Sequence, residues 1–327
     1  MKRFGFLLVV ALGCRAPAIP ESQRFPAGTS LIAREIQVEG RRIRYVEAGA
    51  EGGRGIPVVM VHGLGASLYA WRKNLAPIAA PGFRVIAFDL PGFGFSDKAA
   101  ASYDNASYAR VTVALLDSLH IADAVLVGHS MGGAIAAQVA IEHPERVRGL
   151  VLIGSAGLGV RQPLVLRVAR WPWIGPLALV FRGRGLTARI LRASYADPGK
   201  VTEADVDQYY APTVEPGYAR ALRTVLREFR FDALQGQLDR IATPTLVLCG
   251  EEDRIVPMGL GRALALGIPH AAFLSVAHAG HSVHEEAPDE VNRLIIKFLR
   301  EGLPRVPRDL ARVTSKVYVS STIWLRN

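Results

Sequence analysis

The chain has 327 residues, of which 50% are hydrophobic and 21% are charged, and its formal net charge is +10. This length suffices for one domain of roughly 250 residues with an insertion or tails. The positive charge favours contact with anionic surfaces. No zinc-finger spacing, RNA-binding sheet motif or basic heptad helix accompanies it, so we expect no nucleic-acid partner. No apolar run reaches the roughly 18 residues that a membrane-spanning helix needs.

The first 14 residues are predicted to form an export signal. Lys2 and Arg3 precede an apolar stretch over residues 4–13. The sequence Ala-Leu-Gly-Cys that ends at Cys14 resembles a bacterial lipobox, in which the cysteine is acylated and becomes the new N-terminus. Cleavage near residues 16–18, which read Ala-Pro-Ala, and an uncleaved tail are the alternatives. We therefore expect an exported protein, either a cell-envelope lipoprotein that can meet a membrane surface or a periplasmic or secreted protein.

A linker and a buried second cysteine are also predicted. Residues 15–34 contain three prolines and should form the linker. Cys249 ends a buried-strand pattern and is predicted to be a core residue. Because Cys14 and Cys249 are the two cysteines of the chain, no disulfide framework is expected.

The order of apolar runs predicts an α/β fold. A hairpin is expected over 35–46, and continuous apolar runs then alternate with helical patterns, which indicates a mostly parallel sheet flanked by helices. No buried strand is expected over 156–240, which should be a helical cap inserted before the last strands. The core is then 35–155 and 241–300, and residues 301–327 form a tail of unknown role. The predicted strands are 56–61, 84–88, 124–127, 149–153, 245–248 and 272–276, and the predicted helices are 71–79, 108–119, 131–142 and 289–299.

Ser130 is the strongest candidate for a catalytic residue. It is the centre of Gly128-His-Ser-Met-Gly132, which follows one predicted strand and opens a predicted helix. A serine on such a tight turn is exposed above the sheet, near a helix N-terminus that favours a developing anion. The sequence therefore predicts a serine nucleophile.

A serine nucleophile needs a base, and the base needs a residue that orients it. Asp253 follows a buried strand and should lie at the carboxyl edge of the sheet, while Glu251 and Glu252 are expected to be solvated. His281 follows the last strand and is predicted to be the base. His278 and His284 make a three-histidine metal site the alternative, but this stretch has no organised helical face, so no metal or other cofactor is expected.

These motifs, together with His62-Gly-Leu-Gly65 and Asp89 to Asp97, resemble the α/β-hydrolase superfamily over residues 35–300. The resemblance implies that the backbone N–H groups of Leu64 and Met131 form an oxyanion hole. It also implies that His62, Asp89 and Asp97 hold loops and have no catalytic role.

Within this superfamily the chain is most similar to bacterial lipases and monoacylglycerol lipases. The resemblance implies a carboxylic ester hydrolase with a small-molecule substrate, such as an acylglycerol or another medium-chain acyl ester. Carbon–carbon bond hydrolases of aromatic degradation are the alternative, although they usually place tryptophan where Ser282 stands and asparagine where His129 stands. A non-catalytic binding protein on the same fold is the second alternative.

The predicted cap is strongly basic between Arg161 and Arg192. This interval has seven arginines and no acidic residue, interleaved with apolar side chains. Either the cap rests on an anionic membrane surface, or it packs on its own catalytic domain and leaves the arginines in water.

Overall fold

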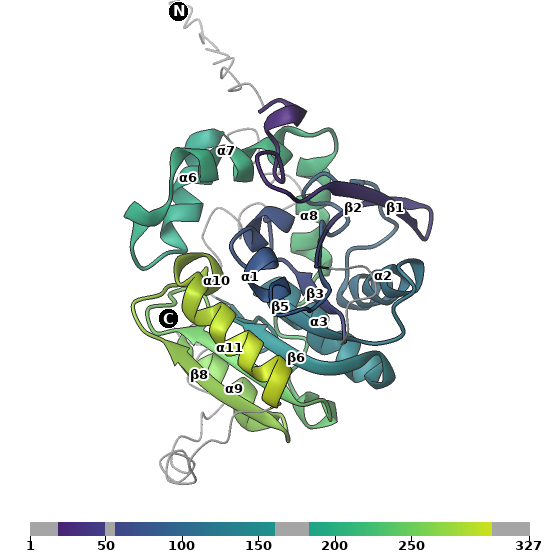
Figure 1. Ribbon diagram of the computed structural model, residues 1–327, viewed down its shortest axis with the longest axis vertical. Helices are drawn as coiled ribbons and strands as arrows, with labels where there is room; N and C mark the ends of the chain where they lie inside the picture. Colours follow the sequence, from purple (N-terminus) through teal and green to yellow (C-terminus); the bar gives the residue numbers. More distant parts are fainter. Residues whose placement is uncertain (1–18, 50–55, 161–182, 303–327) are drawn as a thin grey trace, which may run out of the picture.

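A computed structural model describes residues 19–49, 56–160 and 183–302 and contains an eight-stranded sheet (Figure 1). The strand order is β1-β2-β4-β3-β5-β6-β7-β8. Strands β1 and β2 form an antiparallel hairpin, and β2 pairs antiparallel with β4. All pairs from β4 to β8 are parallel. The strands are β1 Ala33–Val38, β2 Arg41–Ala48, β3 Val58–Val61, β4 Val85–Phe88, β5 Ala124–His129, β6 Val147–Ile153, β7 Thr245–Gly250 and β8 Ala271–Val276.

Helices cover both faces of this sheet, and a group of helices lies over one end (Figure 1). Side chains of α2, α3 and α9 pack on one face, and those of α1 and α11 pack on the other. The α-helices are α1 Leu75–Ala79, α2 Asn105–Ser118, α3 Met131–Glu142, α6 Arg184–Ala193, α7 Glu203–Tyr210, α8 Tyr218–Glu228, α9 Met258–Gly267, α10 Val283–Glu286 and α11 Pro288–Glu301. Short 3-10 helices are η1 Glu21–Gln23, η2 Leu68–Trp71, η3 Pro144–Arg146, η4 Pro198–Lys200, η5 Ala211–Val214 and η6 Leu238–Arg240.

The parallel strands are buried on both faces, which explains their unbroken apolar sequences. In β3, Val59 and Val61 belong to the core on the α2–α3 side, whereas Val58 and Met60 belong to the core on the α1–α11 side. The same alternation runs through β4 to β7, because successive side chains of a strand point to opposite faces. The predicted α/β fold is confirmed.

The helix predicted over 71–79 is wrong in its first half. A turn follows Trp71, and α1 begins only at Leu75. Pro77 lacks an N–H group and its ring would clash with the carbonyl of Lys73 in a continuous helix. That carbonyl instead accepts a hydrogen bond from Asn292 Nδ2 at 2.9 Å. Helix α9 was not among the predicted helices.

The predicted linker is packed in its described part. The Phe25 side chain is buried and contacts the ring of Tyr69, with centroids 5.6 Å apart. The Phe25 N–H donates to Gln208 Oε1 at 3.0 Å, and Arg24 forms an ion pair with Glu215 at 3.2 Å. Residues near 25 are therefore held by an apolar contact with η2 and by polar contacts with the cap, and do not form a free spacer.

The interval 183–240 supplies the cap helices α6 to α8. Helices α6 and α7 share a small core of their own, made of Ala188, Leu191, Tyr195, Val201 and Val206. Helix α8 joins the main core through its apolar side. The acidic side chains of α7 pair with two of the seven arginines: Arg184 bonds Asp207 and Glu203, and Arg192 bonds Glu203.

Several predictions lie outside the described residues: the export signal over 1–14 with Cys14, the arginines at 161, 167, 170 and 182, and the tail after residue 302. Among the described helices, none combines the length and the apolar character needed to cross a bilayer.

Candidate active site

Ser130 lies on a strained turn between β5 and α3. Its backbone angles are φ 53° and ψ −117°, a region that non-glycine residues rarely adopt. The turn requires close packing, since a Cβ on Gly132 would lie 2.1 Å from the Val61 carbonyl oxygen and one on Gly128 would lie 2.4 Å from the Gly132 oxygen. The strand–turn–helix sequence thus brings Ser130 to the edge where the parallel strands end.

His281 and Asp253 form a buried hydrogen-bonded pair at the same edge. His281 Nδ1 lies 2.8 Å from Asp253 Oδ2, and the side chains are 7% and 0% exposed. The other carboxylate oxygen, Oδ1, accepts from the backbone N–H groups of Ile255 and Val256, each at 2.8 Å. Because the carboxylate accepts from Nδ1–H, the Nε2 atom of a neutral His281 is free to accept a proton.

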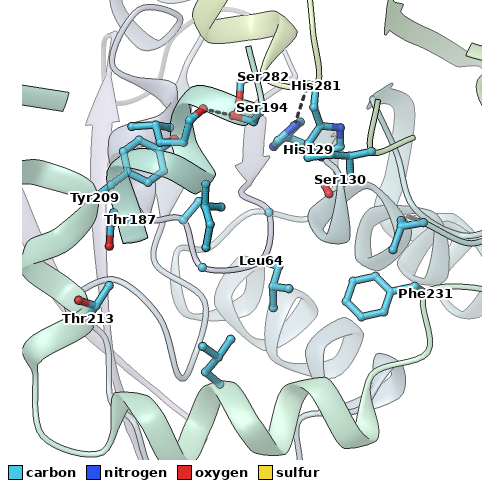
Figure 2. A pocket seen from close by; sticks show the side chains of 18 of the residues that line it. Leu64, His129, Ser130, Thr187, Ser194, Tyr209, Thr213, Phe231, His281 and Ser282 are labelled. Carbon is cyan, nitrogen blue, oxygen red and sulfur yellow. Dashed lines mark hydrogen bonds between the residues drawn. The ribbon is translucent and has the colours of Figure 1, made fainter. Parts of the chain in front are cut away.

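Ser130 and His281 line one pocket, together with their neighbours His129 and Ser282 (Figure 2). Within the described chain, Ser130 Oγ has no hydrogen-bond partner within 3.5 Å. The hydrogen bond between a nucleophile and its base is often long in a free enzyme and shortens when substrate binds.

Two backbone N–H groups near Ser130 have no partner among the described residues. They belong to Leu64, which lines the pocket, and to Met131, the first residue of α3. The first N–H groups of a helix lack intrahelical acceptors. A Cβ on Gly63 would lie 3.1 Å from Ser130 Cβ, so the loop that carries Leu64 passes directly beside the serine.

The pocket has a volume of about 210 Å³ and lies between the sheet edge and the cap. Its described lining contains no Asp, Glu, Lys or Arg side chain. Figure 2 shows Leu64 and Phe231 on one side and Tyr209 and Thr187 of the cap on the other. The cap residues that line the pocket could not be predicted from the sequence, because amphipathic helix periodicity does not indicate which apolar side chains face a pocket. They are Thr187, Ile190, Leu191, Ser194, Tyr209, Thr213, Tyr218 and Leu222.

The side chains of the three histidines in the alternative metal-site prediction point to different surroundings. The His278 side chain is 94% exposed, whereas His281 faces Asp253 and His284 is fully buried against Trp71, with ring centroids 4.4 Å apart. Among the described residues, no group of three His, Cys, Asp or Glu side chains is arranged to hold a metal ion.

Two buried histidines pack behind His281 with their rings tilted to one another. The ring of His129 lies 4.8 Å from that of His281 and 4.5 Å from that of His284, and its Nε2 donates to the His281 carbonyl at 3.0 Å. Burial, followed by the neighbouring His284, lowers the pKa of His129 well below the usual value. Burial, followed by the Arg72 charge, does the same to the pKa of His284. Both rings are therefore neutral near pH 7.

The loop residues have the surroundings that the resemblance implied. His62 Nε2 accepts from the Leu90 N–H at 3.0 Å. The Asp89 carboxylate accepts from the N–H groups of Leu68 at 2.7 Å and Phe95 at 2.8 Å. Asp97 likewise accepts from a backbone N–H, at 2.8 Å. These side chains hold the loops around the pocket and do not line it.

Cys249 is a core residue on β7. It is fully buried, and burial raises the pKa of its thiol to about 12. The Gly261 backbone packs on it so closely that a Cβ there would lie 2.2 Å from the sulfur.

The chain belongs to the alpha/beta hydrolase fold family, whose model matches residues 56–288. It is 30% identical over 270 residues to the uncharacterized hydrolase YugF of Bacillus subtilis (strain 168), which covers 82% of this chain and 97% of that protein. It is 32% identical over 287 residues to the 2-hydroxymuconate semialdehyde hydrolase of Pseudomonas sp. (strain CF600), covering 85% of this chain and 97% of that enzyme.

Solved structures show the same fold. A membrane phospholipase A described as a bacterial virulence factor superposes with a TM-score of 0.68 at 27% identity, over 82% of this chain and 86% of that one. The chain is therefore a hydrolase, and the predicted superfamily is confirmed. The comparisons with hydrolases favour an enzyme over a non-catalytic binding protein.

Proposed function

We propose that the protein is a serine hydrolase that cleaves carboxylic esters with a neutral, apolar acyl group, such as an acylglycerol or another medium-chain ester. The observation that carries this proposal is the pocket: Ser130 and His281 line it, and its described walls are mostly apolar and carry no Asp, Glu, Lys or Arg side chain. A neutral acyl chain can leave water there without leaving a charge unpaired.

The proposed reaction passes through an acyl-enzyme. Ser130 Oγ attacks the acyl carbon while its proton moves to His281 Nε2, and the N–H groups of Leu64 and Met131 stabilise the negative oxygen. His281 then returns the proton to the departing alcohol. A water molecule, deprotonated by His281, attacks the acyl carbon, and His281 gives this proton to Ser130 Oγ as the bond between Ser130 and the acyl group breaks and the acid leaves. Asp253 holds the ring and stabilises its protonated form.

Carbon–carbon bond hydrolysis is the second candidate, since the similar enzyme from Pseudomonas acts on 2-hydroxymuconate semialdehyde. That substrate carries a carboxylate, which Arg and Lys side chains bind strongly and backbone N–H groups also bind. The described pocket lining has no Arg or Lys side chain, and this observation favours a neutral ester.

A substrate panel separates the two candidates. We expect purified protein to hydrolyse nitrophenyl esters from butyrate to laurate and monoacylglycerols, with a higher kcat/KM than for 2-hydroxymuconate semialdehyde, whose loss is followed by its absorbance. Ser130→Ala protein supplies the background rate. A higher kcat/KM for the semialdehyde would overturn the ester assignment.

A further inference from the structure

A second buried carboxylate lies close to the site and has no part in the reaction proposed above. Glu286, at the end of α10, has a fully buried side chain. It accepts three backbone N–H groups: Gly280 at 2.7 Å and Ala196 at 2.9 Å bond Oε2, and Asp197 at 2.8 Å bonds Oε1. Hydrogen bonds from N–H groups to a carboxylate are stronger than those between neutral groups, and here they replace its lost hydration.

The three donors come from two segments far apart in the sequence. Gly280 directly precedes His281, whereas Ala196 and Asp197 follow cap helix α6. The segments are in direct contact, since a Cβ on Gly280 would lie 2.6 Å from the Ala196 nitrogen. One carboxylate oxygen thus joins the loop of His281 to the cap.

The residue after His281 is tied to the cap as well. The Ser282 N–H donates to the Ser194 carbonyl at 3.0 Å, and the two side-chain oxygens lie 2.9 Å apart. Both serines line the pocket, and Figure 2 shows them beside His281. The backbone on each side of His281 is therefore bonded to a segment outside its own loop.

Asp253 bonds one ring atom of His281 and His129 bonds its carbonyl oxygen, so the backbone that precedes His281 depends on other contacts. Glu286 holds that backbone by accepting the Gly280 N–H, and by accepting the Ala196 N–H it attaches the same loop to the cap. The nearest described cation to the Glu286 carboxylate is Lys200 Nζ, which lies 4.0 Å from Oε1 on a side chain that is 43% exposed. The main partners of Glu286 are therefore the backbone N–H groups.

We propose that Glu286 is a positioning residue for His281, which keeps the imidazole in line with Ser130 and couples this alignment to the docked cap. The proposal rests on the proposed function of Ser130 and His281. A displacement of about 1 Å in a catalytic group can cost about 100-fold in rate, so loss of the Gly280 contact should lower turnover without removing any reacting atom.

The test is Glu286→Gln, which keeps the size of the side chain but removes its charge and one acceptor oxygen, so that at least one of the three N–H groups loses its partner and the bond from the Gly280 N–H loses its charge assistance. We expect kcat for a nitrophenyl ester, per folded molecule, to fall about 10- to 100-fold, with little change in KM. Labelling by a fluorophosphonate should slow by the same factor, because it also needs His281. The far-downfield proton signal of the Asp253–His281 hydrogen bond should shift or broaden.

The matched control is Glu290→Gln, the same substitution at a half-exposed carboxylate of α11 that pairs with Arg293; its kcat should equal that of the wild type. A Glu286→Gln protein with wild-type kcat and proton signal would overturn the proposal. A loss that only follows the folded fraction, measured by circular dichroism, would also overturn it. If Ser130→Ala retained turnover, the proposed function would fail, and the proton signal would still decide the role of Glu286.

Discussion

At the scale of single residues, the site combines one strained residue with two buried pairs. Ser130 has an unfavourable backbone conformation that its neighbours impose, and His281 is held by Asp253 in one ring orientation. Behind them, the buried rings of His129 and His284 are neutral because burial lowers the pKa of each. Each of these features has a measurable consequence.

Ser130→Ala is expected to lower ester turnover by roughly 10⁶-fold, because no acyl-enzyme can form. His281→Ala should lose nearly as much, and Asp253→Asn less. Initial rates with a nitrophenyl ester measure these losses. Ser275→Ala, an exposed serine on β8, is the control and should keep wild-type turnover. Ser130→Ala protein with more than about a tenth of the wild-type rate would show that another residue is the nucleophile.

The buried histidines should make the fold sensitive to acid. The pKa of His284 is well below its unfolded value of about 6.5, so below pH 6.5 the unfolded chain binds a proton that the folded chain does not. Stability is therefore fully present above pH 6.5 and falls as pH drops below it, by up to about 1.4 kcal/mol per pH unit for each such histidine.

His284→Phe, an aromatic substitution beside Trp71, should lower this pH slope by one proton. Urea unfolding at pH 7 and pH 5 measures it. His278→Phe, at an exposed position, is the control and should keep the wild-type slope. Equal slopes for His284→Phe and the wild type would contradict the assignment of His284 as neutral and buried.

At the scale of elements, the close approach of β3, β5 and α3 places Ser130. The glycines at 128 and 132 allow this approach, because the carbonyls of neighbouring strands and turns occupy the space of a side chain. The cap helices add the other wall of the pocket, and their contact with α10 reaches the loop of His281.

Gly132→Ala should destabilise the protein by about 1–3 kcal/mol, because its Cβ would lie 2.1 Å from the Val61 oxygen and force a backbone shift. Activity of the folded fraction should also fall, since the shift moves Ser130. Urea unfolding and ester hydrolysis measure the two effects. Gly259→Ala, in α9 with no atom within 4 Å of the added Cβ, should be neutral or slightly stabilising. Equal stability of the two variants would contradict the tight packing at Gly132.

At the scale of the whole molecule, the packing of the segment near Phe25 determines which side of the protein an N-terminal anchor would hold near a membrane. The described chain begins at Ile19, which is five residues from Cys14 and therefore at most about 18 Å away. With Phe25 docked beside the cap helices, an acylated Cys14 would hold the cap side of the molecule near the bilayer.

We expect Cys14 to be acylated and the protein to be found in the membrane fraction. Fractionation of an expressing bacterium fed labelled palmitate should show a labelled wild-type protein and an unlabelled Cys14→Ser protein. Cys249→Ser is the control, since a buried thiol in the core should not affect labelling. A soluble, unlabelled wild-type protein would contradict the anchor and favour a periplasmic or secreted enzyme.

Local sequence was sufficient for most of the strands and helices and for the prediction of three site residues. Strands buried on both faces leave unbroken apolar runs, and the turn at Ser130 leaves glycines at fixed spacing. Asp253 and His281 could be chosen because the carboxyl ends of parallel strands meet at one edge. The first half of the helix predicted over 71–79 is wrong, because the ring of Pro77 would clash with the carbonyl of residue 73 in a helix that begins at Trp71.

Other features depended on the tertiary structure. Three features join segments far apart in the chain: the ring contact between His129 and His284, the bond between Glu286 and Ala196, and the cap residues that line the pocket. Such contacts leave no periodic signal in either segment, because each partner satisfies its own local structure equally well without the other. The sequence by itself therefore determined the fold and predicted the nucleophile, and only the packing of the cap on the sheet edge decided what surrounds the predicted site.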